Sequence, residues 1–156
     1  MTNSSATIYR ERLWPAPWLI ISTALVIPAS LLVFLPINQT VGIIVAIVLY
    51  LAIVAMLVFS TPAIEVTETE FVAGKARLPL ALVGAVTAWS GDEGRLERGQ
   101  NLDARAWLLI RGWIDPVVRI EVTDASDPVP YWLVSTRHPE AVLDALQKTK
   151  PRTPGR

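Results

Sequence analysis

The dominant hydrophobic pattern of the chain is a long stretch without charge. Between Arg12 and Glu65 there is no Asp, Glu, Lys or Arg, and two apolar runs lie inside this stretch, at about residues 17–35 and 41–59. A helix needs about 20 apolar residues to cross a hydrocarbon core of about 30 Å. The pattern therefore predicts a two-helix transmembrane hairpin over residues 14–60, closed by the short connector at residues 36–40.

Three residues inside the apolar runs refine this hairpin. Pro28 lies within the first run and predicts a bend there, because proline removes one helical hydrogen bond. Gly42 and Ala46 are four residues apart in the second run, so they share one helix face. Small residues on one face predict a close approach of the second helix to the first.

After Phe59 the hydrophobic period changes from that of helices to that of strands. Alternation of apolar and polar residues predicts seven short strands: around Ile64–Val66, around Phe71, and at Ala76–Leu80, Val83–Ser90, Trp107–Arg111, Val117–Thr123 and Tyr131–Ser135. The Gly- and charge-rich segment 91–105 is typical of an exposed loop. His138-Pro139-Glu140 then begins an amphipathic helix that runs to about residue 148.

Seven strands followed by one helix is the element order of a pleckstrin-homology-like β-barrel. An antiparallel β-sandwich with a covering helix is the alternative. In either case we expect four parts: a cytoplasmic N-terminal segment at residues 1–13, the hairpin, a β-domain at 61–148 and a disordered basic tail at 149–156.

The charge balance adds orientation and excludes one class of partner. The 14 basic and 14 acidic residues cancel, so nucleic acid is not indicated as a partner. Arg10 and Arg12 precede the hairpin, Lys75 and Arg77 follow it, and the connector has no base. The positive-inside rule then predicts a multi-pass protein of the plasma membrane with both termini in the cytoplasm. Beside Arg10 and Arg12, Trp14 and Trp18 predict a belt at the membrane interface.

Candidate chemistry is sparse along the chain. Cysteine is absent, which excludes thiol catalysis and thiolate metal sites. The single histidine, His138, has no Ser or Asp constellation nearby in the sequence, and Asp124 and Asp127 are explained by a turn. No glycine spacing matches a phosphate-binding loop. We therefore expect no enzyme activity, no cofactor and no metal.

Aromatic and basic residues of the β-domain are the candidate interaction residues. Trp113 follows Arg111 in a predicted loop, and Arg119 lies on the polar face of a strand. Trp132 adjoins Tyr131 in a strand, so their side chains point to opposite faces, and one of them is expected to face outward or to cover the edge.

Two classes of function fit these residues. The first is a non-catalytic scaffold at the cytoplasmic face, whose partner is a membrane or cytoplasmic protein or a further copy of the chain. The second is a domain that senses lipid head groups through Arg111, Trp113 and Arg119. Transport is disfavoured, because the two spans carry no charge for a polar path.

Three segments resemble a family of uncharacterised two-span membrane proteins of actinobacteria. They are Tyr-Arg-Glu-Arg-Leu-Trp-Pro at residues 9–15, Arg-Leu-Pro-Leu at 77–80, and the stretch from Asp124 to Thr136, which Arg-His-Pro-Glu follows. The resemblance covers about residues 8–148. It implies the two-span architecture and the type of organism, and it implies no catalytic residues.

Overall fold

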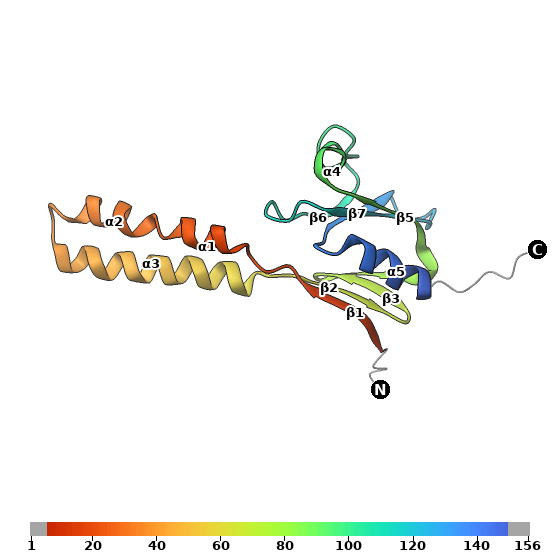
Figure 1. Ribbon diagram of the computed structural model, residues 1–156, viewed down its shortest axis with the longest axis horizontal. Helices are drawn as coiled ribbons and strands as arrows, with labels where there is room; N and C mark the ends of the chain where they lie inside the picture. Colours follow the sequence, from red (N-terminus) through yellow and green to blue (C-terminus); the bar gives the residue numbers. More distant parts are fainter. Residues whose placement is uncertain (1–5, 150–156) are drawn as a thin grey trace, which may run out of the picture. The chain divides into compact units, whose positions relative to one another are not determined.

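A computed structural model describes residues 6–149, which form two compact units (Figure 1). Residues 14–61 are the helical hairpin, and the residues on either side of it together make a β-domain. The chain therefore leaves the β-domain after Leu13 and returns to it at Pro62. The hairpin is an insertion into the β-domain, so residues before the hairpin belong to the same unit as residues after it.

The hairpin contains three helices. These are α1 (Pro17–Thr23), α2 (Val26–Phe34) and α3 (Gln39–Phe59). The break between α1 and α2, at Ala24 and Leu25, lies where Pro28 predicts a bend. A proline ring displaces the carbonyl four residues earlier, here that of Ala24. This carbonyl instead accepts a hydrogen bond from the Ile27 N–H at 3.0 Å.

Helix α3 approaches α2 closely, as the spacing of the small residues in α3 predicts. Gly42 and Ala46 are the buried residues of α3. A Cβ atom added to Gly42 would lie 3.0 Å from the Cβ of Phe34 in α2. Asn38 caps the start of α3, where its side chain accepts hydrogen bonds from two backbone N–H groups.

The hairpin helices are apolar and uncovered. The segments Pro17–Phe34 and Gln39–Phe59 have mean hydropathies of 2.1 and 3.1, and each is long and apolar enough to span a membrane. Only 6% and 11% of their residues are buried. A core helix of a soluble protein has its apolar face covered by other elements. Most of the surface of these two helices is instead exposed.

The β-domain consists of two four-stranded sheets and a C-terminal helix (Figure 1). Sheet 1 has the order β1 (Thr7–Arg12), β2 (Ala63–Thr67), β3 (Glu70–Ala73) and β4 (Ala76–Pro79). A short turn of 3-10 helix, η1 (Leu80–Leu82), leads to sheet 2. That sheet has the order β5 (Val83–Trp89), β7 (Val117–Val122), β8 (Tyr131–Ser135) and β6 (Trp107–Leu109). The final helix is α5 (Pro139–Thr149).

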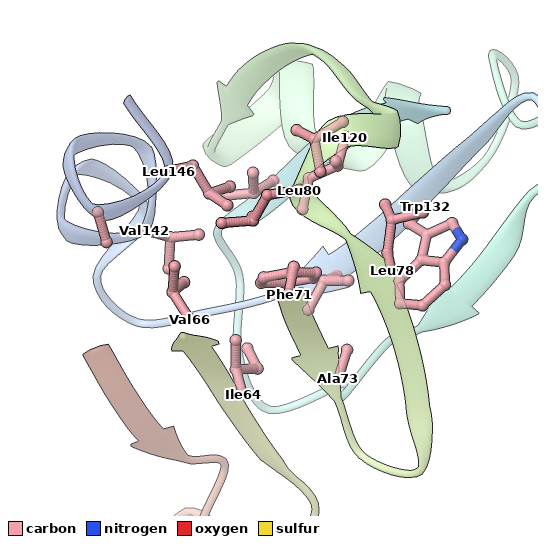
Figure 2. Close-up of a cluster of buried hydrophobic side chains, with 14 of the residues drawn as sticks. Ile64, Val66, Phe71, Ala73, Leu78, Leu80, Ile120, Trp132, Val142 and Leu146 are labelled. Atoms are coloured by element: carbon pink, nitrogen blue, oxygen red, sulfur yellow. The ribbon is translucent and has the colours of Figure 1, made fainter. Parts of the chain in front are cut away.

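The main core lies between the inner faces of the two sheets and α5 (Figure 2). Sheet 1 contributes Ile64, Val66 and Phe71, and sheet 2 contributes Ile120 and Trp132. The apolar stripe of α5 completes the core with Val142, Ala145 and Leu146. The seven expected strands and the C-terminal helix are all present, in the expected order.

Part of the segment 1–13 is a strand, which the sequence pattern does not predict. Strand β1 pairs antiparallel with β2, and Arg12 lies opposite Ala63. The same register sets Tyr9 opposite Val66 and Glu11 opposite Ile64, so Tyr9 and Glu11 face the core. Because Glu11 is charged and yet faces inward, β1 lacks the alternation of apolar and polar residues that predicts a strand. The basic tail expected from 149 onward lies outside the described residues, apart from Thr149, which ends α5.

Segment 91–105 is also corrected. It is not wholly a loop, because residues Gly91–Arg98 form helix α4. This helix and the residues after it lie over the outer face of sheet 2. There Val117, Tyr131 and Leu133 form a second buried cluster. Sheet 2 is thus covered on both faces. Strand β6 is an edge strand of this sheet and runs parallel to β8.

A register shift changes the faces of β5. The sequence predicts one face shared by Val83, Ala85, Thr87 and Trp89. The pairing with β7 is irregular between Val83 and Val86, and beyond this bulge Val86 and Ala88 pack against the main core. Gly84 lies in the bulge. A Cβ atom there would be 3.0 Å from both Glu121 Cβ and Thr123 Cγ2.

We predict that Gly84→Val destabilises the β-domain, because β7 leaves no room for a side chain at this position. Overpacking of this kind costs about 1–3 kcal/mol in the free energy of unfolding. Gly112→Val is the matched control, since an added Cβ at Gly112 meets no atom within 4 Å. Thermal unfolding of the full chain in detergent measures both variants. Equal stability of the two would contradict the close approach of β5 and β7.

Candidate functional site

The loop between β6 and β7 displays two of the candidate interaction residues. Ile114 anchors this loop in the main core with 2% of its surface exposed. The N–H of Arg111 donates to the Ser135 hydroxyl at 3.0 Å, and the Arg111 carbonyl accepts from the Ile114 N–H at 2.9 Å. The Arg111 guanidinium lies 5.9 Å from the ring centroid of Trp113, within cation–π range. The loop is therefore a fixed turn, and Trp113 is half-buried against the core.

Trp132 is a core residue, which corrects its candidacy as an interaction residue. It is 6% exposed, and its ring lies 4.3 Å from that of Trp107 and 6.2 Å from that of Phe71, measured between centroids. Tyr131, on the opposite face of the strand, is 3% exposed. The expectation that one of this pair faces outward is wrong, because α4 and the residues after it cover the second face of sheet 2.

Arg119 takes part in the attachment of α4 to sheet 2 and is not part of the loop site. Its Nη1 atom lies 3.2 Å from Glu97 Oε2, and its guanidinium lies 3.9 Å from the ring centroid of Tyr131. Glu97 is 7% exposed although it is charged. A buried carboxylate requires partners to offset its lost hydration. Arg119 and the Asn101 side chain, 2.9 Å away, supply them.

The ends of α4 are held by a second carboxylate. Asp115 accepts from the Gly91 N–H at 2.7 Å and from Arg98 Nη2 at 2.9 Å. These bonds, that from Gly91 first, lower the pKa of Asp115 below its usual value. Gly94 permits the close contact, since a Cβ there would lie 3.3 Å from the backbone of Trp89. We call Glu97, Arg98, Asp115 and Arg119 the α4 clasp.

A buried polar cluster that the sequence does not reveal joins β1 to the start of α5. Glu11 is 8% exposed and Thr136 is fully buried. Glu11 Oε2 accepts from the Thr136 hydroxyl at 2.5 Å and from the Tyr9 hydroxyl at 3.0 Å. Glu11 Oε1 accepts from the Arg137 N–H at 2.9 Å. We call Tyr9, Glu11 and Thr136 the junction cluster. Alternation of Tyr9, Glu11 and Leu13 against two arginines was the only sequence signal for it.

The junction cluster also changes the acidity of Tyr9. Burial, and then the charge of Glu11, raises the pKa of Tyr9 to about 12. Both effects disfavour the phenolate, because it would place a second negative charge in a poorly hydrated site.

The remaining candidate residues are dispersed. Arg10 faces outward and pairs with Glu65 at 3.0 Å, on the outer face of sheet 1. Trp14 and Trp18 are 45% and 60% exposed. The membrane-interface belt that these residues suggest stays a prediction.

The backbone of His138 and the side chain of Asp124 take part in local structure. The His138 N–H donates to Thr136, and the His138 carbonyl accepts from the first turn of α5. Asp124 Oδ1 accepts from the hydroxyl and N–H of Ser126 at 2.6 and 2.9 Å, as in an Asx turn. Within residues 6–149, no group of three or more His, Asp and Glu side chains is placed to hold a metal ion.

These observations define the class of protein: a β-sandwich with an apolar helical hairpin inserted between its first two strands. Residues 8–146 match the family model described as "Protein of unknown function (DUF3093)", and the chain belongs to this family. The expected membership of an uncharacterised family is thereby confirmed. Comparison with curated proteins and with solved structures finds no match.

We predict that Thr136→Val destabilises the β-domain. Valine has nearly the same shape but removes the hydroxyl that donates to Glu11, and a lost hydrogen bond to a charged group costs about 1.5–3 kcal/mol. Glu65→Gln is the control, because it removes a carboxylate from the ion pair with Arg10 on the outer face. Such a surface pair contributes about 0–1 kcal/mol. A smaller loss for Thr136→Val than for the control would contradict the role of the junction cluster.

A pH dependence follows from Tyr9. The folded chain holds the phenol proton more tightly than the unfolded chain does, since the pKa rises from 10.0 to about 12. Stability from this group is therefore complete below pH 10 and is lost as the pH rises through 12. Thermal midpoints measured between pH 9 and pH 12 should fall more steeply for the wild type than for Tyr9→Phe. Parallel curves would refute the assignment.

Proposed function

We propose that this chain is a non-catalytic interaction module anchored in the plasma membrane by its helical hairpin, with the β-domain at the cytoplasmic face. One observation carries the proposal: the hairpin exposes two apolar helices of spanning length and buries only 6% and 11% of their residues. In water, an apolar surface of this size has a large unfavourable hydration free energy. In a bilayer, the same surface is matched by lipid chains.

The pairing of β1 with β2 supports the orientation. Strand β1 precedes the hairpin and β2 follows it, and the Leu13 N–H donates to the Pro62 carbonyl at 3.1 Å. Both ends of the hairpin must then lie on one side of the membrane. The bases near these ends, Arg10, Arg12, Lys75 and Arg77, favour the cytoplasmic side.

The hollows of the β-domain favour binding through its surface. The hollow between α5 and β5, lined by Val83, Val86, Leu146 and Gln147, has about 100 Å³. Pockets that enclose small molecules measure about 300–1,000 Å³. A larger hollow of about 380 Å³ is lined by residues of α5 alone and is open. Neither of these two hollows suits an enclosed substrate, so they favour binding of a macromolecular or lipid surface.

The proposal extends to the fold type of the β-domain and to its partner. A pleckstrin-homology-like fold is supported by the element order: one sheet, then a second, then a C-terminal helix. In this interpretation the module recruits a membrane or cytoplasmic protein, or a second copy of itself. The actinobacterial origin rests on the sequence resemblance.

The anchoring predicts a specific labelling pattern. Because the chain contains no cysteine, a single introduced thiol reports one position. Ile37→Cys lies in the connector, where the side chain is 75% exposed, and Gln100→Cys lies after α4 in the β-domain. A maleimide that cannot cross membranes should label Ile37→Cys in intact cells, and label Gln100→Cys only after lysis.

A charged residue introduced into α3 provides a control for membrane insertion. Val48 is 61% exposed in the middle of α3, and Val48→Arg should impair insertion, since arginine at the centre of a span costs about 2.5–3.5 kcal/mol. Wild-type protein should stay in the membrane during alkaline carbonate extraction. Release of the wild type into the carbonate supernatant would overturn the proposal.

A further inference from the structure

One end of the β-domain is defined by its covalent link to the hairpin. Strand β1 ends there at Arg12, opposite Ala63 at the start of β2. The turn between β3 and β4 lies at the same end, because the Gly74 N–H donates to the Ala63 carbonyl at 2.8 Å. Lys75, which follows Gly74 in this turn, is exposed. Arg12 and Lys75 are therefore located at the end of the domain at which the chain enters and leaves the hairpin.

The loop that carries Arg111 and Trp113 lies at this end too. A Cβ atom on Gly74 would be 3.8 Å from Cδ1 of Leu109, the last residue of β6, and the loop begins directly after it. Figure 1 shows the loop after β6 projecting at the end of the domain where β2 begins. We call Arg12, Lys75, Arg111 and Trp113 the hairpin-side rim.

The carboxylates at this end are engaged within the domain. Glu11 is buried in the junction cluster, and Asp115 is bound by Gly91 and Arg98. The exposed acids Asp92 and Glu93 belong to the first turn of α4, which lies over the outer face of sheet 2. These two acids mark where the basic surface of the rim ends on the side of α4. The rim itself combines three bases with one aromatic ring.

We propose that the hairpin-side rim docks on the head groups of anionic lipids. The proposal rests on the anchoring proposed above and names the surface through which the anchored domain meets the bilayer. Four residues separate Arg12 from the start of α1 at Pro17. A chain this short spans at most about 14–18 Å. A tryptophan ring is suited to the head-group level. Each base near an anionic leaflet strengthens the association about fivefold.

The composition of the rim favours a lipid over a protein partner. Its bases are exposed or half-buried side chains, and its aromatic ring is already packed against the core. Such a surface offers charge without a deep apolar anchor, whereas protein interfaces depend on anchors buried in pockets. Phosphates of anionic lipids complement it directly.

The test places a spin label in the rim of the full-length protein. Gly112 lies between Arg111 and Trp113, and a Cβ there meets no atom within 4 Å, so Gly112→Cys accepts the label without strain. The protein is reconstituted into nanodiscs of phosphatidylcholine alone or with phosphatidylglycerol. Collision with a water-soluble nickel chelate and with oxygen then reports the depth of the label. A label at Gln100→Cys is the positional control.

With phosphatidylglycerol, the label at residue 112 should lose access to the nickel chelate and reach head-group depth, while the label at residue 100 stays in water. The double change Lys75→Gln and Arg111→Gln should weaken docking about 25-fold, at about fivefold for each base. Arg95→Gln, a change of an exposed base on α4, should have no effect.

Three results would overturn the lipid-docking proposal. The first is equal depth in both lipid mixtures, and the second is docking that survives loss of both bases. The third is protection of residue 112 only when a stoichiometric protein remains bound, as seen by native mass spectrometry. Failure of the hairpin to insert would be separately visible, because the protein would not enter nanodiscs at all.

Discussion

The buried carboxylate of Glu11 is the interaction on which the arrangement of this chain depends. It lies on an edge strand of six residues, and its partners, Thr136 and the N–H of Arg137, come from the junction of β8 and α5. A buried charge that loses its partners is strongly unfavourable. Strand β1 is therefore held to the sandwich by more than its ladder to β2. The residues that precede the hairpin are thus part of the β-domain.

The two faces of sheet 2 are covered by helices that are held by different kinds of interaction. On the inner face, α5 packs an apolar stripe into the main core, and burial of hydrocarbon provides the stabilisation. On the outer face, α4 is polar and is held by the α4 clasp, in which Glu97 pairs with Arg119 and Arg98 pairs with Asp115. Charge pairs fix geometry more strictly than apolar contacts do, so they set where α4 lies.

The sequence predicts the elements in which hydrophobic period and burial agree. The apolar runs, the approach at Gly42 and the seven strands are of this kind. Strand β1 was missed because its inward residue is Glu11, and α4 was missed because its buried residues are Gly94 and Glu97, which make no apolar stripe. Because α4 and the residues after it cover the second face of sheet 2, both Tyr131 and Trp132 are buried. Among the candidate interaction residues, Arg111 and Trp113 lie together in the predicted loop, whereas long-range packing holds Arg119 and Trp132 elsewhere.

The insertion of the hairpin between β1 and β2 has a consequence for biosynthesis. The ribosome completes β1 well before it makes β2, and the two helices are synthesised in between. If the hairpin spans the membrane as proposed, β1 has no partner strand in sheet 1 until the chain has crossed the bilayer twice. A chain that crosses only once would leave β1 and β2 on opposite sides, and Glu11 would have no site in which to bury. Under the proposed anchoring, folding of the β-domain would depend on an even number of crossings, and correct insertion would be a precondition for a folded β-domain.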